Sequence, residues 1–212
     1  MENMTNLEKL VASKLLKIKA VKLQPNNPFT WASGWKSPIY CDNRKTLSYP
    51  ILRNFIKIQL ARLIREKYPE VEVIAGVATG AIAQGAMVAE ELGLPFIYVR
   101  SSPKDHGLEN LLEGDLTPGQ KVIVIEDLIS TGGSSLKAVE AIRNNGGDVI
   151  AMMAIFTYSM PDSEKAFKAA KVPLTTLCRY EAVLEEALKI NYITEEDLET
   201  LNAWKKSPST WK

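Results

Sequence analysis

Residues 122–134 read VIVIEDLISTGGS. The four β-branched residues at the start predict a strand that is buried on both faces. Glu126 and Asp127 stand at the expected carboxyl end of this strand, and a turn rich in serine, threonine and glycine follows. The apolar spacing of residues 136–142 predicts a helix directly after the turn. Ligands of open α/β sheets bind beyond the carboxyl ends of the strands, so this segment predicts a binding site.

The turn at residues 130–134 has the chemistry of a phosphate site. A helix that begins in such a turn offers unpaired N–H groups and the positive end of its dipole. Glycine lets the backbone approach a phosphate closely, and the hydroxyls add further donors. Glu126 and Asp127 would repel a phosphate, so we expect them to bind a neighbouring part of the same ligand. A phosphorylated sugar fits, with its phosphate on the turn and its ring hydroxyls on the carboxylates.

The two commoner nucleotide-binding loops do not fit this segment. A P-loop needs a lysine followed by serine or threonine after its glycines, and the dinucleotide motif G-x-G-x-x-G is also missing. An ordinary strand, turn and helix without a ligand is the alternative interpretation. The acids directly before the turn favour the sugar site.

The segment resembles the phosphoribosyl-pyrophosphate (PRPP) signature of the type I phosphoribosyltransferases. Three further segments resemble parts of the orotate phosphoribosyltransferases: residues 29–40 the N-terminal substrate segment, residues 76–81 the pyrophosphate-side loop, and residues 100–107 the mobile catalytic loop. The four motifs occur in the family's order, and the resemblance covers nearly the whole chain. It implies the type I phosphoribosyltransferase fold, an α/β fold with a mostly parallel central sheet flanked by helices and a small hood from the N-terminal segment.

The order of the predicted elements agrees with that fold. Helices alternate with strands near residues 71–75, 95–99, 121–125, 149–156 and 174–178, which predicts a parallel sheet covered on both faces. A long loop is expected at residues 101–116, and Thr5 with Glu8 predicts a capped first helix. We expect a single domain over residues 1–212, with the hood at about 1–50, the α/β core at about 51–180 and C-terminal helices at about 180–205.

Composition limits the partners of the protein. A chain of 212 residues suits one domain with a substantial core. Its 26 basic and 25 acidic residues give a net charge of +1, so bulk charge attracts neither nucleic acid nor an anionic membrane. Cys41 and Cys178 form no C-x-x-C pair, which argues against structural zinc and fits a reducing compartment. The sequence has no signal-peptide pattern and no long apolar run, so we expect a cytoplasmic protein.

The resemblance assigns binding and catalytic roles. It implies that PRPP binds Thr79, Gly80, Arg100, Lys104, His106, Glu126, Asp127, Leu128, Ile129, Ser130, Thr131, Gly132, Gly133 and Ser134. The turn would hold the 5-phosphate, and the two acids would accept hydrogen bonds from the ribose 2- and 3-hydroxyls.

The expected catalytic residues are Arg100, Lys104, His106 and Asp127. The cations would neutralise the leaving pyrophosphate, and the carboxylate would favour a cation-like sugar ring in the transition state. In the family the catalytic loop reaches the site of the neighbouring subunit, which implies a homodimer with shared active sites. The family also implies Mg²⁺, which would bridge pyrophosphate and ribose oxygens without a direct protein ligand.

The base-binding residues depart from the family's pattern. Many relatives have lysines where Ala32 and Ser101 stand. Enteric-type relatives also have an arginine near the position of Thr157, where this chain has none. The carboxylate of orotate therefore needs another donor in this protein.

Lys36 and Arg44 are the candidates for the carboxylate donor, and this choice stays open. Both are cations of the N-terminal segment that resembles the substrate-binding part of the family. Ser130 and Tyr40 are expected to close on the pyrimidine ring.

The resemblance implies transfer of ribose 5-phosphate from PRPP to orotate, which yields orotidine 5′-monophosphate and pyrophosphate in pyrimidine (UMP) biosynthesis. One alternative is a purine phosphoribosyltransferase, but such relatives would lack the segment at residues 29–40. Another is a non-catalytic regulator that senses PRPP. The presence of Arg100, Lys104 and His106 argues against a regulator.

Overall fold

The computed structural model describes residues 4–31, 33–102 and 111–211. Its centre is a six-stranded sheet with the strand order β10-β9-β8-β5-β6-β7. The strands are β5 (Val73–Val77), β6 (Phe96–Val99), β7 (Leu112–Glu113), β8 (Lys121–Ile129), β9 (Asp148–Thr157) and β10 (Leu174–Arg179). β7 pairs antiparallel with β6, and the other neighbours pair in parallel. The mostly parallel sheet is as predicted, but β7 lies within the segment expected to be a loop.

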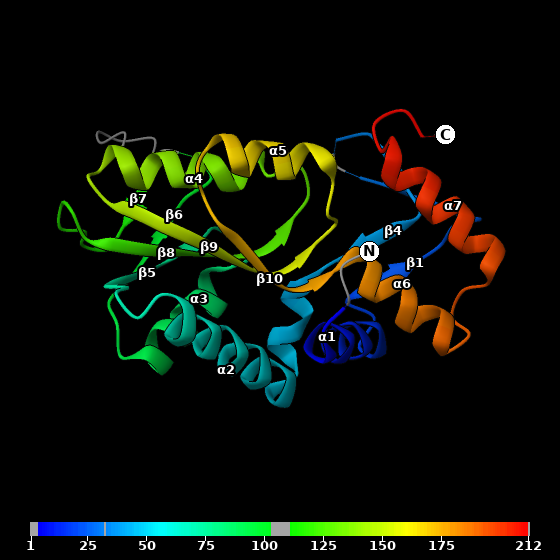
Figure 1. The fold of residues 1–212 in the computed structure, drawn as a ribbon, viewed down its shortest axis with the longest axis horizontal. Coiled ribbons are helices and arrows are strands. Elements are labelled where there is room, and N and C mark those ends of the chain that lie inside the picture. Colours follow the sequence, from blue (N-terminus) through cyan, green and yellow to red (C-terminus); the bar gives the residue numbers. More distant parts are fainter. Residues whose placement is uncertain (1–3, 32, 103–110, 212) are drawn as a thin grey trace.

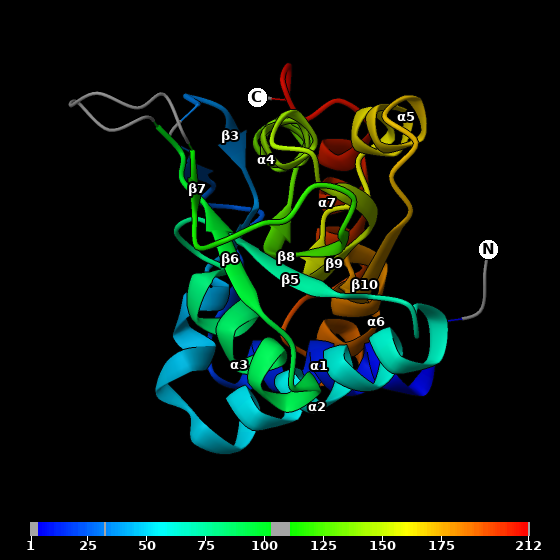
Figure 2. The ribbon, with the colours of Figure 1, turned by 90° about the vertical axis from the view of Figure 1, so that its left-hand side faces the viewer.

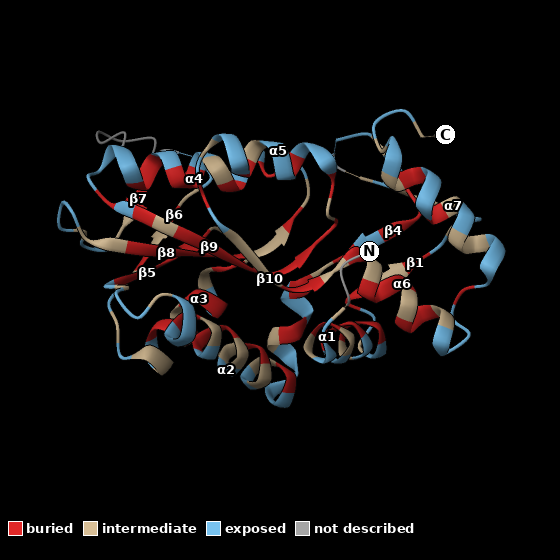
Figure 3. Cartoon of the chain, viewed as in Figure 1, coloured by how far each residue is buried: buried red, intermediate tan, exposed pale blue. Residues whose placement is uncertain are grey.

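Helices cover both faces of the sheet (Figure 1). α1 (Asn6–Lys17), α2 (Pro50–Lys67) and α3 (Ile82–Leu92) lie on one face, and α4 (Gly133–Asn144) and α5 (Pro161–Ala169) lie on the other. Figure 2 shows the same three layers from the side. The strands are largely buried between the helices, and β5 is buried throughout (Figure 3). Burial on both faces explains why these strands are almost continuously apolar.

Alternate residues of β8 face different cores. Ile123 and Ile125 pack in the core that includes α1 and α2, whereas Val122 and Val124 pack in the core that includes α4. Successive side chains of a strand point to opposite faces of the sheet. The next two residues of the strand therefore also lie on opposite faces, and these residues are the two acids.

β8 is longer than the sequence predicted. The expected strand ended at Ile125, with the acids beyond it, but the strand continues to Ile129. Its pairing with β5 ends at Gly76 and Ile125, while its pairing with β9 extends to Thr157 and Ile129. The acids are thus inside β8 but beyond its last partner in β5, which leaves that side of the strand open to a ligand.

The N-terminal segment and the last two helices form a smaller layer at one end of the sheet (Figure 1). It contains the antiparallel pairs β1 (Val21–Leu23) with β4 (Ile39–Cys41) and β2 (Phe29–Thr30) with β3 (Lys36–Ser37), the 3-10 helix η1 (Asn43–Ser48), α6 (Tyr180–Lys189) and α7 (Glu195–Lys206). Trp204 of α7 is fully buried, and its ring lies 5.6 Å from Trp31 and 5.7 Å from Tyr158. This aromatic cluster joins the layer to β9. The division of the chain into hood, core and C-terminal helices stays a prediction.

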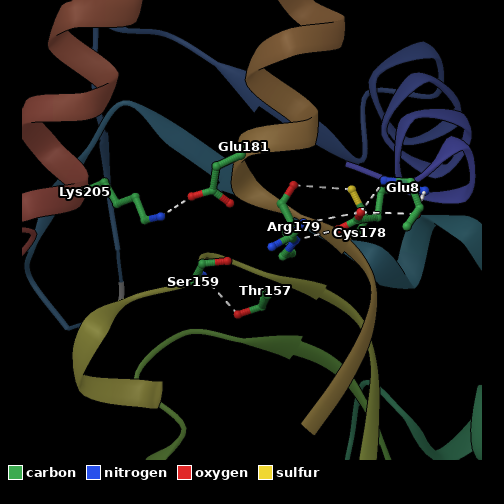
Figure 4. Close-up of polar contacts among 8 residues, drawn as sticks. Glu8, Thr157, Ser159, Cys178, Arg179, Glu181 and Lys205 are labelled. Atoms are coloured by element: carbon green, nitrogen blue, oxygen red, sulfur yellow. Dashed lines mark hydrogen bonds and ion pairs between the residues drawn. The ribbon is translucent and has the colours of Figure 1, made fainter. Parts of the chain in front are cut away.

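Arg179 joins the edge strand β10 to the first helix (Figure 4). Its Nε donates to Glu8 Oε1 at 2.6 Å. The other oxygen of Glu8 accepts a hydrogen bond from the backbone N–H of Thr5 at 2.8 Å, which completes the predicted capping box. The same carboxylate therefore caps α1 and fixes it against the sheet. In the same region, Lys205 of α7 pairs with Glu181 of α6.

Candidate active site

The two acids line a hollow of about 460 Å³ at the carboxyl ends of β5 and β8, here called the acidic hollow. Its walls come from β4 and η1, from the connection between β5 and α3, from β8 and from the start of α4. The lining residues are Cys41, Asp42, Arg44, Val77, Ala78, Thr79, Gly80, Glu126, Asp127, Leu128, Ser130 and Ser134. The fold thus brings half of the predicted PRPP-binding residues to one hollow: Thr79, Gly80, Glu126, Asp127, Leu128, Ser130 and Ser134.

Glu126 points toward α4. Its Oε2 accepts a hydrogen bond from Ser135 Oγ at 2.8 Å, and its Oε1 accepts one from the backbone N–H of Asp127 at 3.0 Å. Burial raises the pKa of Glu126 to about 8, and the neighbouring carboxylate of Asp127 adds to the increase. Glu126 therefore tends to hold a proton near neutral pH, and hydroxyl groups that donate to it would favour its charged form.

The raised pKa of Glu126 predicts how the stability of the free protein depends on pH. Below its ordinary pKa of 4.5, Glu126 is protonated in both the folded and unfolded states. As pH rises toward 8, the unfolded chain releases this proton more readily, so the folded state loses stability. Glu126→Gln stays neutral and avoids this loss. In thermal melts we expect the variant to exceed the wild type by at least about 4 °C at pH 9, and by little at pH 5. An equal difference at both pH values would contradict the assignment.

Asp127 lies on the opposite face, next to the connection between β5 and α3. A Cβ atom on Gly80 would lie 2.3 Å from Asp127 Oδ2, so only glycine permits this approach. The backbone carbonyl of Asp127 accepts a hydrogen bond from Asn43 Nδ2 at 2.5 Å, which ties η1 to β8. Burial raises the pKa of Asp127, and the nearby charge of Arg44 opposes this increase. Asn43 thus fixes the backbone of Asp127, while its carboxylate packs against Gly80 and lines the acidic hollow.

The turn before α4 has the conformation expected of a phosphate site. Gly132 is the N-cap residue, with a left-handed φ of 82°, and a Cβ there would come within 2.8 Å of the Phe167 ring. No side chain caps the helix, and its first turn contains no acidic residue. Ser130 and Ser134 line the acidic hollow, and Thr131 and Gly133 are exposed beside it. Ile129 is fully buried, so it has no side chain available to a ligand.

The predicted catalytic cations are only partly described. Arg100 lies just after β6, and its Nη1 is 3.7 Å from Glu113 Oε1 of β7. It lines a second hollow next to the acidic one. Lys104 and His106 lie outside the described residues, as does Ala32. Their roles therefore stay predictions.

An aromatic hollow of about 350 Å³ adjoins the acidic hollow. It is lined by Thr30, Trp31, Tyr40, Cys41, Leu128, Ser130 and Tyr158, and it shares Cys41, Leu128 and Ser130 with the acidic hollow. The rings of Trp31 and Tyr158 lie 5.1 Å apart. Aromatic walls with a few polar groups suit a flat heterocyclic ring. The structure thus places the predicted base-binding residues Ser130 and Tyr40 beside the predicted sugar site.

The structure separates the two candidate carboxylate donors. Lys36 Nζ donates to Thr30 Oγ1 at 2.8 Å, so it lies at the edge of the aromatic hollow. Arg44 instead lines the acidic hollow, where its Nε is 2.7 Å from Asp42 Oδ1. Lys36 therefore lies beside the aromatic hollow and Arg44 lines the acidic one, while the choice of the carboxylate donor stays a prediction.

Ser135, Trp31 and Tyr158 are among the residues of the site that were not predicted from the sequence. Ser135 contacts Glu126 from the first turn of α4, and Trp31 and Tyr158 form the walls of the aromatic hollow. The richness of residues 29–40 in aromatic side chains was the available signal for Trp31. Ser135 directly follows the predicted phosphate turn, and this proximity could have identified it.

The side chains available to a metal ion are few. Within the described residues, no group of three or more histidine, cysteine, aspartate or glutamate side chains could hold one. Cys41 and Cys178 are buried free thiols. Two adjacent carboxylates beside a phosphate site still fit a Mg²⁺ ion that arrives with its substrate, since Mg²⁺ usually keeps most of its ligands from phosphates and water. A separate finding concerns membranes: no helix in the described part of the chain combines the length and apolarity needed to cross one.

Comparison with known proteins shows the family of this chain. Residues 52–176 match the model of the phosphoribosyl transferase domain. The chain is 70% identical over 208 residues to the orotate phosphoribosyltransferase of Bacteroides thetaiotaomicron, covering 98% of each chain. It also resembles the crystal structure of the enzyme from Aeropyrum pernix, with a TM-score of 0.75, 28% identity, and coverage of 87% of this chain and 99% of the other. The fold is shared with the Mycobacterium tuberculosis enzyme in complex with PRPP, with a TM-score of 0.63, 21% identity, and coverage of 83% and 98%. The chain belongs to the phosphoribosyl transferase domain family and, within it, to the orotate phosphoribosyltransferases.

Proposed function

We propose that the protein transfers the 5-phosphoribosyl group of PRPP to orotate, giving orotidine 5′-monophosphate and pyrophosphate in UMP biosynthesis. The observation that carries this proposal is the junction of the two hollows. The acidic hollow has a phosphate turn and two acids, and it opens into the aromatic hollow through Cys41, Leu128 and Ser130. A sugar bound in the first would present its C1 atom to a ring bound in the second.

Each group of residues would have a separate role in the reaction. The turn at 130–134 would hold the 5-phosphate, while Glu126 and Asp127 would accept hydrogen bonds from the ribose hydroxyls. The bond between C1 and pyrophosphate breaks and the bond from C1 to the ring nitrogen of orotate forms, with inversion at C1. Positive charge develops on the sugar ring between these events, and the neighbouring carboxylates stabilise it. Arg100, Lys104 and His106 would neutralise the departing pyrophosphate.

Magnesium would serve this reaction as a partner of the substrate. Glu126 and Asp127 are the side chains beside which the substrate would hold the ion, and the described residues contain no group of three or more metal-binding side chains that would hold it alone. The ion would offset negative charge on the leaving group. We also propose a cytoplasmic homodimer in which the loop at residues 100–107 completes the site of the neighbouring subunit, as the family resemblance implies.

A steady-state assay tests the proposed function. Purified protein with PRPP and Mg²⁺ should deplete orotate, followed by the loss of its absorbance, and should leave adenine and hypoxanthine unchanged. Consumption of a purine instead of orotate would favour the purine phosphoribosyltransferase alternative. Binding of PRPP without turnover of any base would favour the regulator.

The position of Lys36 predicts the donor to the orotate carboxylate. Lys36→Ala should raise the KM for orotate about tenfold, because it removes one charge-assisted contact, and should leave the KM for PRPP within about twofold. Inhibition by uracil, which lacks the carboxylate, should not change. Arg44→Ala is the matched comparison and should affect PRPP rather than orotate. The opposite pattern in the two KM values would assign the carboxylate to Arg44.

A further inference from the structure

Trp204 of α7 contacts both aromatic walls of the aromatic hollow without lining it. The rings of Trp31 and Tyr158 form these walls, and the ring of Trp204 lies 5.6 Å from the first and 5.7 Å from the second. Both contacts are edge-on, with interplanar angles of 76° and 75°. Trp204 is fully buried and is not among the residues that line the hollow. Its ring therefore supports the two walls from behind.

The position of Trp31 depends on its side-chain contacts. The residue directly follows β2, a strand of two residues that pairs with β3 alone. Its Nε1 donates to the backbone carbonyl of Ile39 at 3.2 Å, which fixes one edge of the indole ring. The rings of Tyr158 and Trp204 contact it from the body of the protein. A two-stranded pair is only marginally stable by itself, so these ring contacts are needed to keep the wall in place.

The helix that carries Trp204 is fixed on both sides of this residue. Tyr180 of α6 packs its ring 5.7 Å from the ring of Trp204, and its Oη donates to the backbone carbonyl of Leu201 in α7 at 3.0 Å. Lys205, the next residue of α7, pairs with Glu181 of α6, as Figure 4 shows. One contact lies before Trp204 in the sequence and one lies after it. The ring thus has a defined position relative to the sheet.

The indole ring of Trp204 carries a cost that a phenyl ring would avoid. Its Nε1 is buried and has no hydrogen-bond partner in the described part of the chain. A buried donor without an acceptor destabilises the fold. Phenylalanine would remove this donor, but its smaller ring would leave space behind the walls. We therefore expect Trp204→Phe to stay folded while the walls become less firmly supported.

The acidic hollow is separate from this cluster of rings. Among the described residues, its lining includes neither Trp31 nor Tyr158, and the residues that it shares with the aromatic hollow are Cys41, Leu128 and Ser130. A change at Trp204 should therefore alter the aromatic hollow and leave the acidic hollow as it is.

We propose that Trp204 is a positioning residue for the base, which keeps Trp31 and Tyr158 in the arrangement that receives the ring of orotate. The inference rests on the proposed function and extends it to α7, a helix that lines neither hollow. A flat ring binds more tightly to walls that are already in place, because less ordering is needed when it binds. Trp204 supplies this order in the free protein.

Titration with two ligands tests the role of Trp204. Orotidine 5′-monophosphate would occupy both hollows, whereas ribose 5-phosphate would occupy the acidic hollow. Calorimetry of Trp204→Leu should show a Kd for orotidine 5′-monophosphate about tenfold weaker than that of the wild type, because the ring contacts behind the walls are lost. The Kd for ribose 5-phosphate should stay within about twofold. Trp204→Phe keeps a ring edge and should weaken the first Kd only about threefold. The KM for orotate should rise in the same order, and that for PRPP should not.

Two controls separate this role from a general loss of packing. Leu60 of α2 is fully buried in the same core as Trp204 and lines neither hollow. Leu60→Ala should lower the melting temperature at least as much as Trp204→Phe and leave both Kd values unchanged. The second control is a Trp31→Ala background, which lacks one of the supported walls. Adding Trp204→Leu there should weaken binding of orotidine 5′-monophosphate at most about threefold.

Three results would overturn the inference. The first is a Trp204→Leu protein that binds both ligands as the wild type does. The second is an equal loss for both ligands, which would show that Trp204 serves the fold as a whole. The third is a tenfold loss that persists in the Trp31→Ala background. If Trp204→Leu does not fold, an unchanged ratio of the two Kd values in Trp204→Phe is equally decisive.

The titrations are independent of the proposed reaction. A wild-type protein that binds orotidine 5′-monophosphate but transfers nothing from PRPP to orotate would refute the proposed function. The two Kd values would still decide whether Trp204 positions the walls of the aromatic hollow.

Discussion

Asp127→Asn should lower kcat/KM for PRPP by about 10²–10³, the usual loss when one preorganised electrostatic contact to a transition state is removed. The amide keeps the shape of the side chain, so Gly80 need not move, and the hydrogen bond from Asn43 to the backbone carbonyl of residue 127 is unaffected. Only the negative charge beside the sugar ring disappears. Steady-state kinetics at saturating orotate measure the effect, and a thermal melt measures stability in parallel.

The melt separates a catalytic role of Asp127 from a structural one. Burial raises the pKa of this carboxyl group, so ionised Asp127 is costly to the free protein. The asparagine variant should therefore melt at or above the wild-type temperature at pH 8. A variant that melts early but retains normal kinetics would show that the carboxylate serves the fold.

Gly80→Ala should lower kcat/KM by about 10², although it alters no charged group. The new Cβ would lie 2.3 Å from Asp127 Oδ2 and 2.5 Å from its Cγ, distances that no side chain tolerates. Either the carboxylate or the connection at residues 78–81 must move by roughly an ångström, and displacements of that size disrupt catalytic alignment. The same kinetic assay measures the loss.

A double-mutant cycle tests whether Asp127 is the reason that Gly80 is needed. In an Asp127→Ala background the carboxylate is gone, so adding Gly80→Ala should cost little more in PRPP affinity. Losses that simply add would mean that Gly80 is required for another reason, such as direct contact of its backbone with pyrophosphate.

The predictable part of the site lies along one continuous segment. The doublet and the turn follow each other in the sequence, and Glu126, Asp127, Ser130 and Ser134 line one hollow as the pattern predicts. Their binding roles stay predictions. The predicted end of β8 at Ile125 was wrong because local sequence preference does not decide where a strand ends. Leu128 and Ile129 continue the strand since Phe156 and Thr157 of β9 extend alongside them, while β5 has already ended.

The choice between Lys36 and Arg44 depends on contacts between distant residues. Lys36 lies within the aromatic segment at residues 29–40 and Arg44 lies four residues after it, and this spacing alone could not separate them. The antiparallel pairing of β2 with β3 places Lys36 opposite Thr30 and so at the aromatic hollow. η1 turns Arg44 toward β8 instead. Tyr158 escaped prediction for the same reason, because its neighbour Trp31 comes from the other end of the chain.

The acids of β8 differ in length by one methylene group, and each side of the sheet accepts only one of the two lengths. Glu126 is long enough to reach the serine hydroxyl on α4, and Asp127 is short enough to fit over a residue without a side chain. Exchanging them would leave the aspartate short of its donor and force the glutamate into the backbone. Glutamate and aspartate are thus not interchangeable at positions 126 and 127. Their order in the sequence determines which acid lies on which face of the sheet.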